Sequence, residues 1–183
     1  MALFLVEIHS ITAMFLSVCK TAQRTDLADI PAFYKVSLGG DPAERSRPQL
    51  VGPSGFWVAA LESKGGTSQV LGCLGLDCHQ LEGADELHGE LRRMFVSRHY
   101  RRHGIGSRLL SEAISHARGF ALPMTMELET SELQLAAQSL YEKHGFGVVG
   151  TRVIPMGQLS VLWMFRFRRT LHTVDTTPNG WSN

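Results

Sequence analysis

Cysteine is scarce in this sequence: there are three in 183 residues, an odd number that argues against a secreted module held by disulfides. Cys73, Cys78 and His79 lie close together, yet no CxxC pair is present to anchor a zinc ion. A P-loop and an HExxH motif are absent too, which removes the usual signals of P-loop nucleotide hydrolysis and zinc proteolysis. We therefore expect no metal site.

Charge of either sign is also sparse. Charged residues make up 19% of the chain, below the roughly 25% of soluble domains. The net charge of +1 gives no overall attraction to nucleic acid or to an anionic membrane. Hydrophobic residues make up 44%, which excludes a disordered chain and supplies the core of one domain. Six arginines and no acidic residue lie between Glu90 and Glu112: Arg92, Arg93, Arg98, Arg101, Arg102 and Arg108.

The N-terminus carries a long hydrophobic run. Residues 1–19 are mostly apolar, near the minimum of about 17 residues that span a bilayer. Glu7 interrupts the run, and an acidic residue at the centre of a membrane helix costs roughly 2.5–3.5 kcal/mol. No basic region accompanies the run, which argues against a signal peptide. Residues 15–22 equally fit a first β-strand, which would leave residues 1–14, too few to cross a membrane. Residues 1–14 then associate with a membrane, pack against the domain or a partner, or hang free.

Strand and helix patterns alternate through the rest of the chain. The β-type runs are 55–62, 69–77, 89–96, 124–128, 148–154 and 159–167, the first two forming a hairpin. The helical patterns are 25–34, capped by Thr25-Asp26, then 105–117, and 133–144 with Gly145 after it. This alternation predicts one α/β domain over 15–169, a mixed sheet layered by helices, and a loose polar tail over 170–183.

Two further features concern the surface and the core of this domain. Residues 37–54 hold three glycines and three prolines, which is typical of a surface loop. Trp57 and Trp163 both fall within β-type runs, so we expect both side chains to pack in the core.

A basic turn with two glycines joins the 89–96 strand to the helix that follows. Residues 101–106 (RRHGIG) would place free N–H groups and the positive end of a helix dipole where a phosphate is favoured. Leu109 stands in the place of a third glycine, which disfavours a GxGxxG dinucleotide site. The alternative is a solvated basic turn before a surface helix. We interpret His99 and His103, which flank the turn, as accessory phosphate contacts or exposed polar residues and not as catalytic groups.

Two motifs resemble those of one superfamily. Residues 89–110 (GELRRMFVSRHYRRHGIGSRLL) are similar to the acetyl-CoA segment of the GNAT superfamily of N-acetyltransferases, whose signature is R/Q-x-x-G-x-G/A. Residues 137–146 (AQSLYEKHGF) resemble its A-x-x-L-Y-x-x-x-G-F helix. Residues 25–34, 56–59 and Thr130-Ser131 with Gln134 look like the camello (N-acetyltransferase-8-like) branch. The short N-terminal run, broken by Glu7, and the long 37–54 loop depart from that branch.

The resemblance implies a single GNAT domain with a mixed sheet of six to seven strands, splayed between the fourth and fifth (89–96 and 124–128). It implies acetyl transfer from acetyl-CoA to a primary amine by direct attack in a ternary complex. The 101–106 amides would hold the pyrophosphate and the Val96 N–H would face the developing oxyanion. The implied cofactor-binding residues are Met94, Phe95, Val96, Arg101, Arg102, His103, Gly104, Ile105, Gly106 and Gln134.

Two catalytic residues are implied in the same way. Tyr141 occupies the family's tyrosine position, where a phenol of pKa about 10 would protonate a leaving thiolate whose conjugate acid is near 8.5. Glu90 is the candidate general base, with Glu86 and His88 as alternatives. Glu90 could instead form an ion pair with Arg92, which shares its face of the strand. Arg92 or Arg93 could also clamp a carboxylate of the substrate.

Several partners stay open. The acceptor is a small amino-acid-type amine or a protein lysine, and both a homodimer and membrane association through residues 1–14 fit the resemblance. The resemblance also implies a location at the endoplasmic-reticulum membrane, and the alternative is a cytoplasmic location. A CoA-binding module without turnover is a second function. A nucleic-acid-binding domain that uses the 92–108 arginines is a third, disfavoured by the neutral overall charge, so nucleic acid is not the expected partner.

Overall fold

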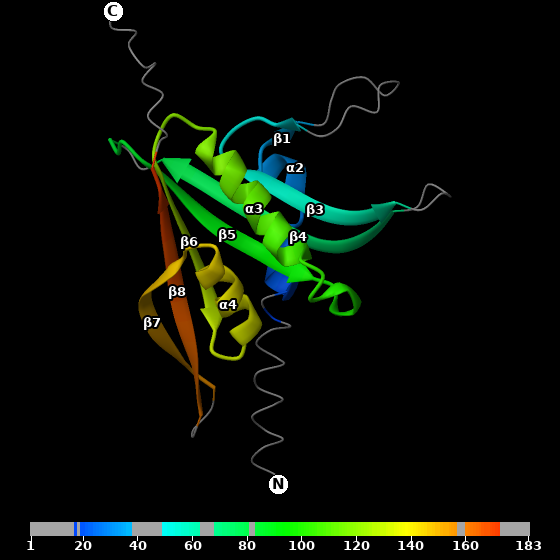
Figure 1. The fold of residues 1–183 in the computed structure, drawn as a ribbon, viewed down its shortest axis with the longest axis vertical. Helices are drawn as coiled ribbons and strands as arrows, with labels where there is room; N and C mark the ends of the chain where they lie inside the picture. Colours follow the sequence, from blue (N-terminus) through cyan, green and yellow to red (C-terminus); the bar gives the residue numbers. More distant parts are fainter. Residues whose placement is uncertain are drawn as a thin grey trace, which may run out of the picture.

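The structure is a computed structural model that describes residue 17 and residues 19–37, 49–62, 68–80, 83–156 and 160–172. Six strands form one mixed sheet in the order β3-β4-β5-β6-β8-β7 (Figure 1). A small second sheet pairs β1 (Val36–Ser37) with β2 (Gln49–Leu50). The bounds of the six strands are β3 Gly55–Glu62, β4 Ser68–Gln80, β5 Leu87–Val96, β6 Met124–Ser131, β7 Gly147–Pro155 and β8 Val161–Leu171.

All but one of the pairs of neighbouring strands in the large sheet are antiparallel. The predicted hairpin is confirmed as β3–β4, and the six strands predicted from residue 55 onward are present with ends within a few residues of the prediction. The exception is β5–β6, which is parallel. A parallel pair needs a crossover, and α3 (Ile105–Arg118) supplies it.

The predicted splay is confirmed between β5 and β6. Their parallel pairing runs only from Leu87 opposite Met124 to Glu90 opposite Glu127. Beyond that point β5 continues to Val96 and β6 to Ser131, with no pairing between them in the described chain. The two strands therefore part toward the lower end of the molecule in Figure 1. We call this unpaired stretch the split.

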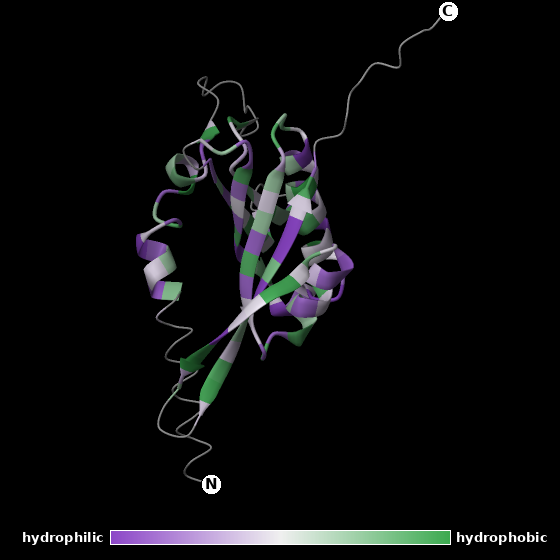
Figure 2. Cartoon of the chain, turned by 90° about the vertical axis from the view of Figure 1, so that its left-hand side faces the viewer, coloured by the Kyte–Doolittle hydropathy of each residue, from purple (hydrophilic) through white to green (hydrophobic). Residues whose placement is uncertain are grey.

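Two helices, α3 and α4 (Leu135–Lys143), cover one face of the sheet, and the short N-terminal helical stretches lie on the other face (Figures 1 and 2). The apolar stripe predicted for the first of these helices is confirmed, because α3 buries Leu109, Leu110, Ala113, Ile114 and Ala117. These side chains form one core with β4, β5 and β6. Each fully buried leucine contributes about 1.5–3 kcal/mol to folding.

The N-terminal region differs from two predictions. Residues 19–24 are helical, so the alternative of a first strand over 15–22 is wrong for its described part. The next helix is α2 (Ile30–Phe33), and its cap is Asp29, whose carboxylate accepts a hydrogen bond from the Ala32 N–H at 3.1 Å. Thr25-Asp26 is therefore not a helix cap. Asp26 is buried instead.

Some sequence predictions fall outside the described residues. These include residues 1–14, most of the 37–54 loop and the tail after His172. Among the helices that the structure does describe, none reaches the length and hydropathy of a membrane span.

The two tryptophans have different environments. Trp57 is partly buried and packs against the core, as predicted. Trp163 is 43% exposed, so its predicted core position is wrong. It lies in β8 near the end of the β7–β8 hairpin, which extends past the helices in Figure 1.

Candidate functional site

Main-chain groups of β5 face the split at Val96. Gly72 of β4 lies opposite Val96, and the N–H of Ser97 donates to the Leu71 carbonyl at 2.7 Å. In an antiparallel pair this pattern leaves the two opposed residues without mutual hydrogen bonds. The N–H and C=O of Val96 therefore point away from β4, toward β6. The Val96 carbonyl already accepts a bond from Arg101 Nε at 3.2 Å.

The opposite side of the split is built in the same way. Ser131 of β6 lies opposite Met164 of β8, and the Glu132 N–H donates to the Trp163 carbonyl at 2.9 Å. By the same rule the Ser131 main chain points away from β8. Its N–H is directed toward β5, whereas its carbonyl accepts from the Gln134 N–H at 3.0 Å and from Gln138 Nε2 at 2.9 Å. The split is thus a place where both strands present main-chain hydrogen-bonding groups that no neighbouring strand uses.

The start of α3 presents free amides close to the end of β5. Gly104 is the N-cap, with a φ of +77° that favours glycine, and no side chain caps the helix. The first bond of the helix runs from the Arg108 N–H to the Gly104 carbonyl at 2.9 Å. Within the described chain, the N–H groups of residues 104–107 have no main-chain or capping acceptor. Such unpaired amides at the positive end of a helix dipole favour an anion.

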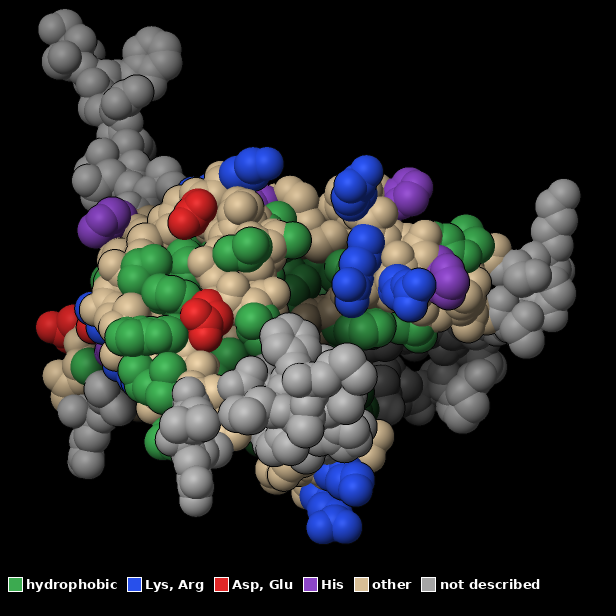
Figure 3. Space-filling model, turned by 90° about the horizontal axis from the view of Figure 1, so that it is seen from below, with side chains coloured by type: hydrophobic (Ala, Val, Ile, Leu, Met, Phe, Trp, Pro, Cys, Tyr) green, Lys and Arg blue, Asp and Glu red, His purple; other side chains and the backbone are tan. Residues whose placement is uncertain are grey.

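The surface around these amides is basic and open. Arg101, Arg102, His103 and Gly104 are exposed. Seen from below in Figure 3, Lys or Arg and His side chains gather on one side of a hollow in which hydrophobic side chains are set back. The turn is therefore accessible, with its polar groups available to a ligand.

Contacts between α3 and α4 close the other side of the turn. A Cβ built on Gly106 would lie 3.4 Å from the Leu140 side chain, so the helices approach closely here. Ser107 Oγ and His144 Nε2 are 2.8 Å apart, and Arg169 donates to the His144 carbonyl oxygen. Burial and the nearby Arg169 lower the pKa of His144, which favours the neutral form of its ring. Neither Ser107 nor His144 was identified from the sequence.

Tyr141 lies on α4 on the same face of the sheet. It is 6% exposed, and its ring centroid is 6.1 Å from that of Phe146 and 5.9 Å from that of Phe167. Burial raises the pKa of the Tyr141 phenol to about 12, with no hydrogen bond contributing to the shift. The hydroxyl is therefore protonated at any physiological pH and available as a donor.

Glu90 lies on the opposite face, at the last paired position before the split. Its carboxylate lies 2.9 Å from Arg92 Nε, and Arg92 also lies 3.9 Å from Asp77. The ion pair considered from the sequence is thus present. Of the two alternatives to Glu90, Glu86 lies 3.1 Å from His88.

The remaining predicted contacts are more scattered. Met94 packs against the core from β5, whereas Phe95 is 53% exposed. Gln134 is the N-cap residue of α4, and its Oε1 accepts a hydrogen bond from Thr130 Oγ1 at 2.6 Å. The Gln134 amide oxygen is therefore already engaged.

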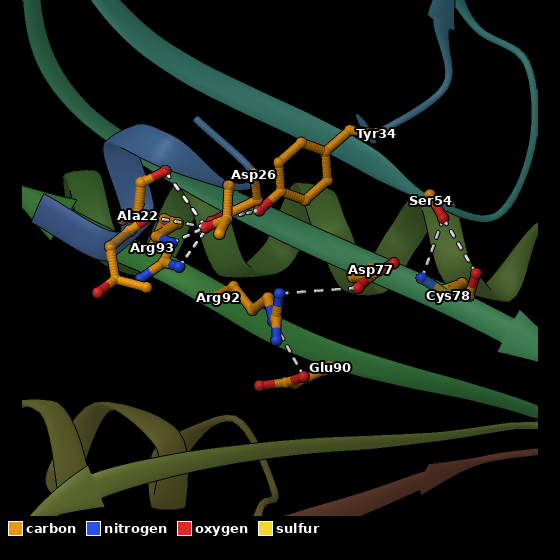
Figure 4. A network of polar contacts seen from close by, with 11 residues as sticks. Ala22, Asp26, Tyr34, Ser54, Asp77, Cys78, Glu90, Arg92 and Arg93 are labelled. Atoms are coloured by element: carbon orange, nitrogen blue, oxygen red, sulfur yellow. Dashed lines mark hydrogen bonds and ion pairs between the residues drawn. The ribbon is translucent and has the colours of Figure 1, made fainter. Parts of the chain in front are cut away.

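A buried network beside the split was not foreseen from the sequence. Asp26 is fully buried and receives bonds from Arg93, from the Tyr34 hydroxyl at 2.8 Å and from Thr25 (Figure 4). Arg93 has a φ of +56° in an irregular stretch of β5, where the β4–β5 register shifts. Because Arg93 is committed to Asp26, the suggestion that it clamps a substrate carboxylate is wrong.

Comparisons with known proteins agree on one family. Residues 52–148 match the family model "Acetyltransferase (GNAT) domain". The chain is 33% identical over 137 residues to an N-acetylaspartate synthetase of Danio rerio, covering 75% of this chain and 40% of that protein. It is 31% identical over 151 residues to a probable N-acetyltransferase camello of Xenopus tropicalis, covering 81% and 54%. The chain thus spans about half the length of the curated relatives it matches.

Two solved structures share the fold. An Arabidopsis thaliana NAA60 in complex with a bisubstrate analogue superposes with a TM-score of 0.56 at 15% identity, covering 66% of this chain and 78% of that one. A NatC complex bound to Gag peptide and CoA gives a TM-score of 0.53 at 25% identity, covering 64% and 71%.

Proposed function

Since the chain belongs to the GNAT acetyltransferase family, we propose that it transfers the acetyl group of acetyl-CoA to a primary amine by direct attack in a ternary complex. One observation carries this proposal: the free amides of residues 104–107 lie beside the end of β5, where Val96 turns its N–H toward the split. Acetyl-CoA carries both a diphosphate and an acyl thioester, which the pantetheine arm joins. The site offers partners for both.

The diphosphate would bind at the start of α3. The amides of Gly104, Ile105 and Gly106 would donate to it, Arg101 and Arg102 would add positive charge, and His103 would be a further polar contact. A bound phosphate would draw Arg101 from its present contact with the Val96 carbonyl. The acyl arm would then lie along Met94, Phe95 and Val96, and Gln134 would contact it from α4 through its amide nitrogen.

The reaction forms a bond from the amine nitrogen to the acetyl carbon and breaks the carbon–sulfur bond. The nitrogen loses a proton and the thiolate gains one. The Val96 N–H would stabilise the negative charge on the carbonyl oxygen. Tyr141, with a pKa of about 12, would donate a hydrogen bond to the leaving sulfur. A thiol near pKa 8.5 is the stronger acid, so the phenol keeps its proton and the thiolate takes its proton from solvent, to which the general base releases the proton of the amine.

Glu90 is proposed to accept the proton of the amine, directly or through water. Its place at the head of the split and its half-exposed carboxylate support this role. The Arg92 contact competes with it and favours a second function, a CoA-binding module without turnover. The nucleic-acid alternative is weakened, because Arg92 and Arg93 are both paired with carboxylates.

The acceptor is proposed to be a small amino-acid-type amine or a protein lysine. A mass-spectrometric screen of free amino acids and lysine peptides with saturating acetyl-CoA tests the activity and the acceptor together. Acetylation of a defined amine supports the transferase. Saturable acetyl-CoA binding with no product from any amine would favour the binding module instead.

Two associations implied by the resemblance stay proposals. A homodimer is supported by β7, an edge strand with exposed valines at 148 and 153. Membrane association is supported by the apolar composition of residues 1–14 alone. Light scattering tests the homodimer, and vesicle flotation tests the membrane association. Binding to vesicles would favour the proposed endoplasmic-reticulum location over the cytoplasmic alternative.

A further inference from the structure

Ser131 carries a buried hydroxyl with nothing to bond. Its residue is 2% exposed, and within the described chain its Oγ is the one enclosed side-chain polar atom without a hydrogen-bond partner. A buried hydroxyl that has lost its water and gained no partner destabilises a fold. Because no group of the described chain bonds this hydroxyl, it is a candidate for a hydrogen bond to a ligand.

Ser54 shows how the same side chain is satisfied elsewhere in this protein. It is 1% exposed, and its Oγ accepts from the Cys78 N–H at 2.9 Å and donates to the Cys78 carbonyl at 3.2 Å. The two serines thus match in residue type and burial and differ in partners. The comparison makes Ser54 the natural control for Ser131.

The position of Ser131 relates its hydroxyl to the split. It is the last residue of β6, in the part that has left β5. Side chains alternate along a strand, and Ser131 follows Glu127 and Glu129 at intervals of two. Those glutamates contact arginines of β7 and β8, on the face away from the core that packs under α3 and α4. The Ser131 side chain therefore belongs to that same face.

The charged neighbours on this face are occupied. Glu129 contacts Arg152 at 2.7 Å and Arg166 at 3.5 Å, and Glu127 contacts Arg168 at 2.6 Å. The Ser131 hydroxyl is thus an uncommitted neutral group in a region of paired charges.

We propose that Ser131 Oγ is a binding contact for the acceptor, accepting a hydrogen bond from the N–H of the attacking amine. This rests on the proposed function. The amide cradle and Tyr141 lie on the face of α3 and α4, so the carrier approaches the split from that side. An amine that attacks the thioester carbonyl would then approach from the opposite face of the sheet, to which the Ser131 side chain belongs. Holding one N–H directs the nitrogen lone pair toward the acetyl carbon.

The test compares Ser131→Ala and Ser54→Ala by three measurements. Thermal melting reports stability, calorimetry with acetyl-CoA reports carrier affinity, and CoA release reports turnover. The acceptor probe is a mixture of the twenty free L-amino acids with Nα-blocked lysine, varied in concentration at saturating acetyl-CoA. We expect Ser131→Ala to melt at or above the wild-type temperature, while Ser54→Ala melts below it. The KM for the amine should rise about tenfold in Ser131→Ala, with acetyl-CoA affinity unchanged.

Three results would overturn the inference while leaving the proposed function intact. They are an unchanged amine KM in Ser131→Ala, a loss of acetyl-CoA affinity by the same factor, and a melting temperature lowered as far as in Ser54→Ala. Wild-type protein that binds acetyl-CoA and acetylates none of the probe amines would overturn the proposed function, and this inference with it.

Discussion

Arg93 of β5 donates hydrogen bonds to both carboxylate oxygens of Asp26, with Nε 2.7 Å from Oδ2 and Nη2 2.6 Å from Oδ1. The pair ties the N-terminal helical region to the irregular stretch of β5 that precedes Val96. The Tyr34 hydroxyl completes the contact on Asp26. The fold thus fixes the strand that borders the split from the face opposite α3.

Replacing Asp26 by Asn should lower the free energy of unfolding by about 3–5 kcal/mol, because Arg93 then loses its buried counter-charge. The pKa of Asp26 is held well below its usual range by hydrogen bonds from Arg93 and Tyr34, although its burial acts in the opposite sense. A lowered pKa stabilises the fold above the unfolded value of about 3.9, and this contribution is lost as pH falls below it. Denaturant melts between pH 7 and pH 3 should show that loss in the wild type and a smaller one in Asp26→Asn.

Gly104→Ala should weaken acetyl-CoA binding by about tenfold. A Cβ at this position meets no atom, but its φ of +77° strains any other residue by about 1 kcal/mol and would reorient the free amides. Gly147→Ala is the control, because that glycine has open space and no positive φ. Equal acetyl-CoA affinities in the two variants, measured by calorimetry, would contradict a cradle at Gly104.

Arg101→Gln should also lower acetyl-CoA affinity, by about tenfold at low salt and by less at high salt, because exposed charges are screened. Arg118→Gln provides the comparison, since it removes another exposed arginine, from the far end of α3. Titrations at two ionic strengths check both variants. If the two variants lose acetyl-CoA affinity by the same factor, Arg101 contributes only general positive charge and makes no specific contact with the diphosphate.

Tyr141→Phe should reduce kcat by roughly 10²-fold with little change in acetyl-CoA affinity. Folding stability should stay close to the wild type, since burial accounts for the raised pKa and no hydrogen bond to the hydroxyl contributes. Because that pKa is about 12, the activity of the wild type should show no loss from phenol ionisation below about pH 11. A variant with wild-type kcat would remove Tyr141 from the chemistry.

Glu90→Gln and Arg92→Gln together separate a proton acceptor from an ion-pair partner. If Glu90 accepts the proton of the amine, Glu90→Gln should lose at least 10²-fold in kcat, while Arg92→Gln keeps most of its activity. Similar and small losses in both variants would identify a surface ion pair, which contributes about 0–1 kcal/mol to stability.

Features set by neighbouring residues could be predicted from the sequence. The apolar spacing from Ile105 to Ala117 gave the α3 helix, and the glycines of the RRHGIG turn indicated its free amides, because both patterns are local. Features that join distant residues could not. Asp26 and Arg93 are 67 positions apart, and Ser107 and His144 are 37 apart, so no spacing rule brings them together.

Burial on strands was also hard to predict. Trp163 lies in β8, but the β7–β8 hairpin continues beyond the part of the sheet that α4 covers, so its side chain stays exposed. Thr25-Asp26 has the composition of a helix cap, yet Asp26 bonds Arg93, and Asp29 caps the next helix. In both places the tertiary structure overrides a local preference.

Hydrogen exchange at the amides of residues 104–107, measured with and without acetyl-CoA, tests the central claim most directly. These N–H groups lack a main-chain acceptor, so they should exchange fast in the free protein and at least about tenfold more slowly with acetyl-CoA bound. Saturable acetyl-CoA binding that leaves their exchange unchanged would contradict the account.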